Sequence, residues 1–133
     1  QAQLLNLLRD LQRDEGLAMV FVTHDLGVAS YLCERVAVMY LGRIVEIGSV
    51  DQVLGAPRHP YTKALLSAVP RADLDAATLP QKLTGDLPSP ADPPSGCHFH
   101  PRCPKAMAHC ATQRPVLREL APGHLAACHL NDT

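Results

Sequence analysis

Four cysteines in the last third of the chain have the residue type and clustering needed to bind a metal or to form cross-links. They are separated by five, six and seventeen residues, at Cys97, Cys103, Cys110 and Cys128. Their segment is rich in proline, histidine and arginine and poor in large apolar side chains. Because fewer than about 40 residues rarely bury enough apolar surface to fold alone, we expect these cysteines to replace a hydrophobic core.

The spacing of these cysteines leaves three kinds of cross-link open. Disulfides require an oxidising compartment, and because the sequence shows no secretion signal we expect reduced thiols. Structural zinc is usually held by paired cysteines two to four residues apart, which this spacing lacks, although four-cysteine zinc sites are not bound to one spacing. A [4Fe-4S] cluster takes four thiolates from widely spaced positions.

Other polar residues surround the four cysteines. Five histidines could replace a cysteine as ligand, although each alone is more often a packing or hydrogen-bonding residue: His98, His100, His109, His124 and His129. Four cations either offset the charge of metal-bound thiolates or form an ordinary solvated surface: Arg102, Lys105, Arg114 and Arg118. The fifth cysteine, Cys33, lies in a predicted helix, where we expect an inert buried thiol.

One histidine, His24, stands apart and directly follows a continuous apolar run, residues 18–23. The length of this run and its β-branched residues predict a strand of a parallel sheet that is buried on both faces. Because ligands of α/β sheets bind at the carboxyl ends of the strands, His24 is a candidate functional residue. Asp25 is suited to cap the helix that follows it.

The apolar periodicity predicts further helices and strands on both sides of His24. The expected helices cover residues 1–14, 25–32, a segment that starts after Ser49, and 60–69, and the expected strands cover 18–23, 35–40 and 43–47. Leu41-Gly42 joins the last two strands, and the access of glycine to positive φ favours a hairpin there. No N-cap precedes the first helix, so we expect the natural helix to begin upstream of Gln1.

The composition excludes some functional classes. The chain has 12 basic and 13 acidic residues, and this near-neutral balance argues against a nucleic-acid partner. Tryptophan is absent and aromatic residues are few, which argues against a base-stacking surface. No apolar run approaches the roughly 18 residues that a membrane-spanning helix needs.

Two sequence motifs resemble the end of the nucleotide-binding domain of ABC transporters. They are Phe-Val-Thr-His-Asp-Leu at residues 21–26 and the apolar run at 36–48. In that family a switch-loop histidine follows a core strand and is itself followed by a terminal hairpin. By this resemblance His24 contacts the γ-phosphate of ATP and helps to position the attacking water, since an imidazole can donate a hydrogen bond to a developing anionic oxygen.

The same resemblance implies catalytic groups that these 133 residues do not contain. The phosphate-binding G-x-x-x-x-G-K-[ST] loop, the signature motif of the family and the strand ending in Asp-Glu are all missing from the sequence. By the order of motifs in the family, all three precede Gln1. We therefore expect that this chain does not hydrolyse ATP by itself.

A narrower resemblance points to the ATPase subunits of oligopeptide and dipeptide importers. Residues 57–66, which contain His-Pro-Tyr-Thr, are similar to the segment that follows the core in those subunits. Residues 96–104, together with Cys110, 122–124 and 127–129, resemble their C-terminal extension. This resemblance implies a [4Fe-4S] cluster on the four cysteines, and four thiolate ligands with no open position indicate a structural role for it.

We therefore predict the C-terminal part of a peptide-importer ATPase. The fold class is α/β, a C-terminal fragment of an ABC-type nucleotide-binding domain followed by a small irregular extension stabilised by a metal or cluster. Its expected parts are the end of the ATPase core, a helical extension, a proline-rich linker and a cysteine-rich cluster-binding cap, at residues 1–48, 49–70, 71–95 and 96–133.

The resemblance also implies cofactors and partners for the full-length subunit. The cofactors are ATP and Mg²⁺, with the [4Fe-4S] cluster, or Zn²⁺ as the alternative, in the extension. The partners are transmembrane permease subunits and a second ATPase subunit, at the cytoplasmic face of the cell membrane. The alternative function is a freestanding interaction module stabilised by zinc or an iron-sulfur cluster, with an unrelated α/β half.

Overall fold

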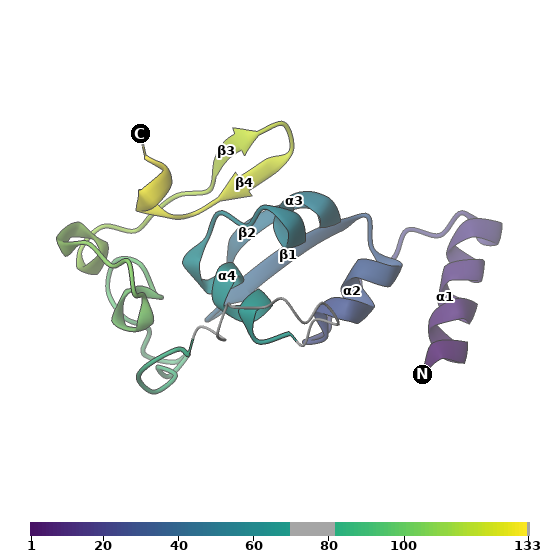
Figure 1. Cartoon of the computed structure of the whole chain (residues 1–133), viewed down its shortest axis with the longest axis horizontal. Helices are drawn as coiled ribbons and strands as arrows, with labels where there is room; N and C mark the ends of the chain where they lie inside the picture. Colours follow the sequence, from purple (N-terminus) through teal and green to yellow (C-terminus); the bar gives the residue numbers. More distant parts are fainter. Residues whose placement is uncertain (70–81, 133) are drawn as a thin grey trace, which may run out of the picture.

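The computed structural model describes residues 1–69 and 82–132 as a mixed α/β fold (Figure 1). Its helices are α1 (Ala2–Glu15), α2 (Leu26–Leu32), α3 (Val50–Gly55) and α4 (Pro60–Ser67). Its strands are β1 (Arg35–Tyr40), β2 (Arg43–Ser49), β3 (Arg118–Ala121) and β4 (His124–Ala126). Short 3₁₀ helices shape the cysteine-rich segment, at η1 (His100–Arg102), η2 (Ala108–Ala111) and η3 (His129–Asn131).

The described strands form one antiparallel sheet in the order β1-β2-β4-β3. The predicted hairpin is confirmed, because β1 pairs with β2 across a turn in which Leu41 and Gly42 both have positive φ, 46° and 74°. The cysteine-rich extension adds β4 to the free edge of β2, with Glu46 opposite Ala126. Strands from the two ends of the described chain therefore share one sheet.

An aromatic cluster joins the extension to the segment before it. Phe99 is 1% exposed and packs edge-to-face on Tyr40 of β1, with ring centroids 5.2 Å apart. Its ring also contacts Tyr61 at 5.4 Å and His59 at 5.8 Å. Since a buried Phe in such geometry stabilises by burial and by ring contacts, Phe99 supplies the apolar anchor that the extension otherwise lacks.

Three side-chain caps confirm the predicted helix starts. Asp25 accepts a hydrogen bond from the backbone N–H of Val28 at the start of α2. Ser49 and Gln52 form a reciprocal capping box at the start of α3. His59 caps α4 through Nδ1, which accepts from the backbone N–H of the second helical residue at 3.0 Å.

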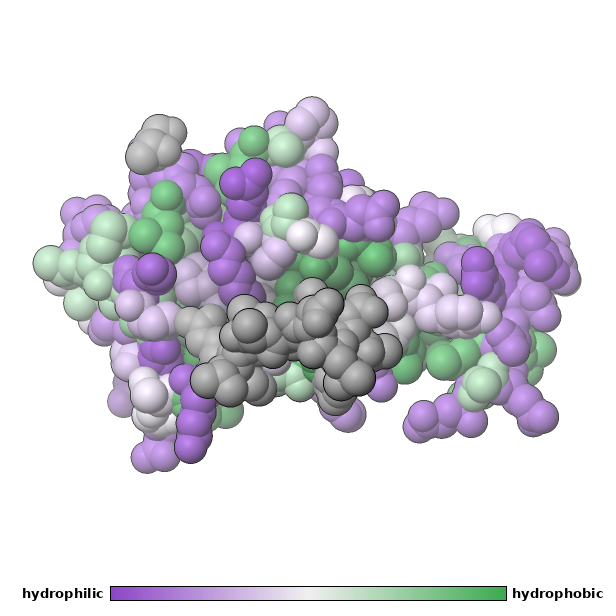
Figure 2. Space-filling model, viewed as in Figure 1, coloured by the Kyte–Doolittle hydropathy of each residue, from purple (hydrophilic) through white to green (hydrophobic). Residues whose placement is uncertain are grey.

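Helix α1 confirms the predicted first helix but lies at one end of the molecule (Figure 1). It buries none of its residues, and Leu4 and Leu7 remain more than half exposed. It rests on α2 through Tyr31, whose hydroxyl bonds to Asn6 and whose ring lies under Arg9. Figure 2 shows apolar side chains reaching the surface around α1 and α2. No helix in the described parts of the chain is both long and apolar enough to cross a membrane.

The predicted parallel strand over residues 18–23 is wrong for this structure. These residues form no strand, and Val20 and Val22 are 95% and 92% exposed. A strand that is apolar on both faces needs neighbours to pair with and layers to cover it, and no described strand lies beside this run. The sheet is antiparallel, so His24 follows an extended exposed segment and does not stand at the end of a buried strand.

The β3–β4 hairpin was not predicted from the sequence, which indicated an irregular extension. The available signal was Pro122-Gly123, a dipeptide that favours a tight turn between short apolar segments. Gly123 has φ 74°, the conformation that such a turn requires. Of the predicted linker at 71–95, residues 71–81 lie outside the described residues, as does Pro70 at the end of the predicted helical extension, and 82–95 contain no regular helix or strand.

Candidate functional site

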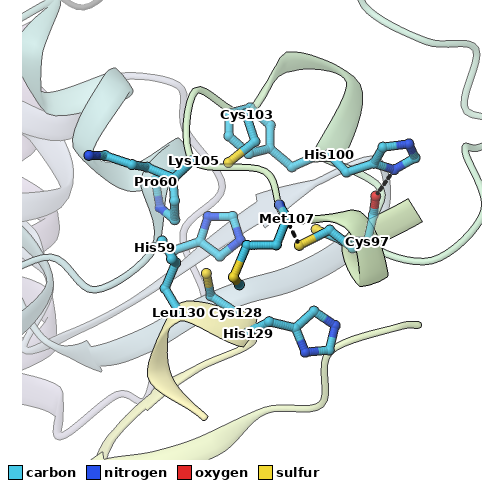
Figure 3. A pocket seen from close by; sticks show the side chains of 12 residues that line it. His59, Pro60, Cys97, His100, Cys103, Lys105, Met107, Cys128, His129 and Leu130 are labelled. Atoms are coloured by element: carbon cyan, nitrogen blue, oxygen red, sulfur yellow. Dashed lines mark hydrogen bonds between the residues drawn. The ribbon is translucent and has the colours of Figure 1, made fainter. Parts of the chain in front are cut away.

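The four predicted cysteines line one cavity beside α4 (Figure 3). They reach it from the loops around η1 and η2 and from the end of β4. The space between the walls, including its opening to solvent, is about 310 Å³, and the accessible wall is apolar. The remaining lining residues are His59, Pro60, Phe99, His100, Lys105, Met107, His129 and Leu130. Tertiary structure thus brings together cysteines that are up to 31 positions apart in sequence.

Local turns hold the first three of these cysteines. The Cys97 N–H donates to the Cys110 carbonyl at 2.8 Å, which closes the segment between them. Within it, His100 N–H donates to the Cys97 carbonyl at 3.1 Å and Cys103 N–H to the His100 carbonyl at 3.3 Å. Cys110 N–H donates to the Met107 carbonyl at 3.0 Å. The segment therefore folds its own thiols around the cavity.

Backbone N–H groups lie beside each of the four sulfurs. Met107 N–H donates to Cys110 Sγ at 3.4 Å. The other donors are the backbone N–H groups of Phe99 and His100 to Cys97, of Lys105 to Cys103 and of Leu130 to Cys128. Such donors stabilise negative charge on sulfur, and hydrogen bonds of this kind tune metal-bound thiolates.

Burial opposes ionisation of these thiols when no cation is near. It is the largest effect on Cys128, whose pKa is raised to about 11, and the other three thiols raise it further. Burial likewise raises the pKa of Cys97 and of Cys103, and their backbone donors partly counter the rise. A bound metal supplies the missing positive charge and deprotonates coordinating thiols.

Two observations bear on the three kinds of cross-link. All five cysteines, each within the described residues, are free thiols, so no disulfide is formed. Among residues 1–69 and 82–132, no group of three or more His, Cys, Asp or Glu side chains is arranged to hold a single metal ion. Cys33, which was expected to be buried, is half-buried at the end of α2 and packs against the core.

A buried carboxylate lies behind the cavity. Glu46 on β2 has no exposed surface, and one of its oxygens accepts from the Arg58 backbone N–H at 2.8 Å and pairs with His124 Nε2 at 2.7 Å. Its other oxygen accepts from the His59 backbone N–H at 2.9 Å. Three donors from two other segments thus compensate one buried charge.

Sequence analysis did not identify this role of Glu46. The available signal was one acidic residue inside the apolar strand run Ile-Val-Glu-Ile at 44–47. A buried charge is rare unless it is paired, so the position required a partner that only the fold supplies.

Three of the five histidines near the cysteines have defined side-chain hydrogen-bond partners, whereas His98 Nδ1 is buried without one, and none of the five is grouped with the cysteines as a ligand of one ion in the described chain. His124 binds Glu46, and His100 Nδ1 lies 2.7 Å from the Cys97 carbonyl. His129 contacts the Gln113 carbonyl at 2.9 Å and Asp132 at 2.7 Å, and the ring of His109 packs on it. The pKa of His98 is lowered by burial and by Arg43 and Arg114.

His24 lies outside this site, on an exposed turn before α2. The turn is held by Asp25, whose N–H donates to Thr23 Oγ1 at 3.0 Å and whose carboxylate caps the helix. The imidazole is therefore free to meet a ligand from outside the described chain. Its catalytic role stays a prediction.

Comparison with known sequences assigns a family to this arrangement. A family profile described as the oligopeptide/dipeptide transporter C-terminal region matches residues 45–110, from the middle of β2 through the third cysteine of the cavity. The chain belongs to this family. The match contains the buried carboxylate, the His-Pro-Tyr-Thr segment at the start of α4 and Phe99, whereas Tyr40, His124 and Cys128 lie outside it.

Relatives extend the similarity over nearly the whole chain. A putative peptide import ATP-binding protein of Brucella ovis is 59% identical over 128 residues, 96% of this chain and 40% of that protein. The dipeptide transport ATP-binding protein DppF of Haemophilus influenzae is 50% identical over 96% of this chain and 39% of its own length. The putative oligopeptide transport ATP-binding protein YkfD of Bacillus subtilis is 47% identical over 98% and 40%. This chain thus spans about 40% of the length of these relatives.

Gly96 is predicted to be indispensable for the pairing of Cys97 with Cys110. It has φ 66°, and a Cβ there would lie 2.3 Å from the Cys110 carbonyl oxygen. Gly96→Ala should lower the free energy of unfolding in urea by about 3 kcal/mol, from backbone strain plus overpacking. The control is Gly42→Ala, at φ 74° with no atom within 4 Å, which should cost only the strain, about 1 to 2 kcal/mol. Equal losses in the two variants would contradict the close approach.

His59 is predicted to make stability fall in mild acid. Burial lowers its pKa from 6.5 to about 4. Between pH 6.5 and pH 4 the His59 side chain is therefore protonated in the unfolded chain but mostly neutral in the folded chain. The stability that is present above pH 6.5 is lost as the pH falls towards 4. The full loss is about 3 kcal/mol. Urea unfolding across this range should show it.

The matched control for this titration is His59→Asn, whose amide oxygen can still cap α4 but does not titrate. Other groups titrate in both proteins, so the measure is the difference between the two pH profiles. Parallel profiles from pH 7 to pH 4 would show that His59 is not the group responsible.

Proposed function

We propose that this chain serves as the C-terminal region of an ATP-binding subunit that powers oligopeptide or dipeptide import. The family match and the names of the relatives support this assignment, and the packing of the His-Pro-Tyr-Thr loop against the cysteine-rich extension agrees with it. In the full-length subunit, ATP binding closes two such subunits against the permease, and hydrolysis reopens them. The subunit then lies at the cytoplasmic face of the membrane.

We also propose that His24 is the switch-loop histidine of that subunit. Its exposed position on a capped turn suits an imidazole that reaches a nucleotide held by other residues. There it would donate a hydrogen bond to the γ-phosphate and help to orient water. The phosphate loop and Mg²⁺ ligands belong to the remainder of the subunit.

The four cysteines are proposed to hold a [4Fe-4S] cluster in the extension. The observation that supports this is that one apolar cavity is lined by all four thiols, with backbone N–H groups beside the sulfurs. The wide spacing of the four cysteines suits a cluster, which takes thiolates from widely spaced positions, better than zinc, which is usually held by closely paired cysteines. When bound, the cluster supplies a cross-link between segments that carry little apolar surface.

Anaerobic loading tests the cluster. The reduced chain, incubated with ferrous iron and sulfide and then desalted, should retain about four iron and four sulfide ions per chain. It should be brown. Cys103→Ala should lose most of this iron, whereas Cys33→Ala, which alters the cysteine outside the cavity, should keep it. A colourless wild-type chain that binds one zinc ion would overturn the proposal.

Turnover in the full-length subunit tests His24. His24→Ala should lower the ATP hydrolysis rate by about 10²- to 10³-fold, the usual cost of one transition-state donor, while MgATP binding persists. Thr23→Ala is the control, because it removes the 3.0 Å turn hydrogen bond and keeps the imidazole. An unchanged rate in His24→Ala would remove the switch assignment.

A further inference from the structure

Cys128 reaches the cavity by a different route from the other three cysteines. Cys97, Cys103 and Cys110 belong to one short segment, which the hydrogen bond from Cys97 N–H to the Cys110 carbonyl closes on itself. Cys128 is 18 positions beyond Cys110 and lies just after β4. Its distance from the other thiols is therefore set by where the sheet places the end of β4.

Contacts to β2 and to the loop before α4 fix the residues just before Cys128. Ala126 is opposite Glu46 in the β2–β4 ladder, and Ala127 N–H donates to the Val45 carbonyl at 2.8 Å. His59, whose Nδ1 caps α4, also hydrogen-bonds to the backbone of Ala127. Both alanines are buried. None of these contacts involves residues 97–110.

The Glu46 side chain binds both the loop before α4 and strand β4, the two segments that make these contacts. Its carboxylate holds His124 at the start of β4 at 2.7 Å and the backbone N–H groups of Arg58 and His59 at 2.8 and 2.9 Å. The same side chain thus fixes β4 and the loop that carries His59 relative to β2. No other described carboxylate has a fully buried side chain.

We propose that Glu46 is a positioning residue that places the Cys128 thiol against the other three thiols of the cavity. Its two oxygens satisfy three donors, and no neutral isostere can do so. A glutamine would offer one carbonyl oxygen and point an NH₂ donor at groups that are themselves donors. The end of β4 would then keep only its backbone pairing with β2 and the contact of His129 with the Gln113 carbonyl at 2.9 Å, so it would move away from the cavity more often.

Thiol labelling of the complete, metal-free, reduced chain tests the placement directly. The rates at which iodoacetamide labels each cysteine are measured by peptide mass spectrometry. In Glu46→Gln the rate at Cys128 should rise about tenfold, the factor that corresponds to local opening made easier by about 1.4 kcal/mol when a buried hydrogen-bond partner is lost. The rates at Cys97 and Cys110 should stay within twofold of wild type, roughly the scatter expected for sites with unchanged contacts.

The chain offers a matched control in Glu119→Gln. Glu119 accepts a 2.8 Å hydrogen bond from the Gly123 backbone N–H within the β3–β4 hairpin but is exposed and does not contact β2. This substitution makes the same chemical change on the other side of β4. It should leave all four labelling rates unchanged.

Iron loading provides a second readout that rests on the proposed cluster. After anaerobic loading with ferrous iron and sulfide, Glu46→Gln should release iron to a chelator about tenfold faster than wild type. Its visible absorption and electron paramagnetic resonance spectra should move towards those of Cys128→Ser, and Glu119→Gln should match wild type. A general loss of stability would not reproduce the spectrum of one missing thiolate.

A milder variant keeps the proposal testable if Glu46→Gln does not fold. His124→Leu removes one of the three donors and should raise labelling at Cys128 by a smaller factor. Where both single variants fold, the double variant should add little to Glu46→Gln, because coupled groups are not additive.

Three results decide between the alternatives. Wild-type labelling of Cys128 in Glu46→Gln and His124→Leu would overturn the proposal, and so would an equal rise at all four cavity cysteines. If the wild-type chain binds no iron but Cys128 alone responds to Glu46→Gln, the placement stands and the cluster assignment falls.

Discussion

A single buried carboxylate is the interaction on which the other packing contacts depend. Glu46 sits in the central part of the sheet, where an unpaired charge would cost several kcal/mol. It is tolerated because His124 and the backbone of the loop before α4 supply three donors. Those donors come from segments far apart in sequence. The hairpin, the loop and the last strand must therefore assemble together, since any one absent leaves a buried polar group unsatisfied.

This requirement explains how a segment with little apolar surface keeps an ordered shape. One face of the extension is anchored by Phe99 in the aromatic cluster, and another by the pairing of β4 with β2. The thiols occupy the space between these anchors. A cluster in the cavity would cross-link segments of the extension that are already close together. This proximity lowers the entropic cost of ordering those segments when the cluster binds. The proposed cofactor and the protein core thus support each other.

Prediction from sequence succeeded where local interactions decide the conformation. The caps at Asp25 and Ser49 and the Leu41-Gly42 turn involve residues within a few positions of each other, so their patterns specify the geometry. It failed for residues 18–23, whose apolar character indicates a buried strand only if neighbouring strands exist. It also missed β3 and β4, which are too short to show periodicity and are stabilised by pairing with β2.

The sequence by itself determined the chemical resources of this protein: four thiols, an isolated histidine on a turn, and local signals for helices and a hairpin. Its motifs also led to the transporter family. Only the tertiary structure decided that the four thiols meet at one cavity and that Glu46 joins the segments around it. Such contacts depend on which distant segments pack together, and no spacing within one segment encodes that choice. A charged residue within an apolar strand run indicates that the charge needs a partner. Which groups act as partners, here His124 and the backbone N–H groups of Arg58 and His59, depends on the fold.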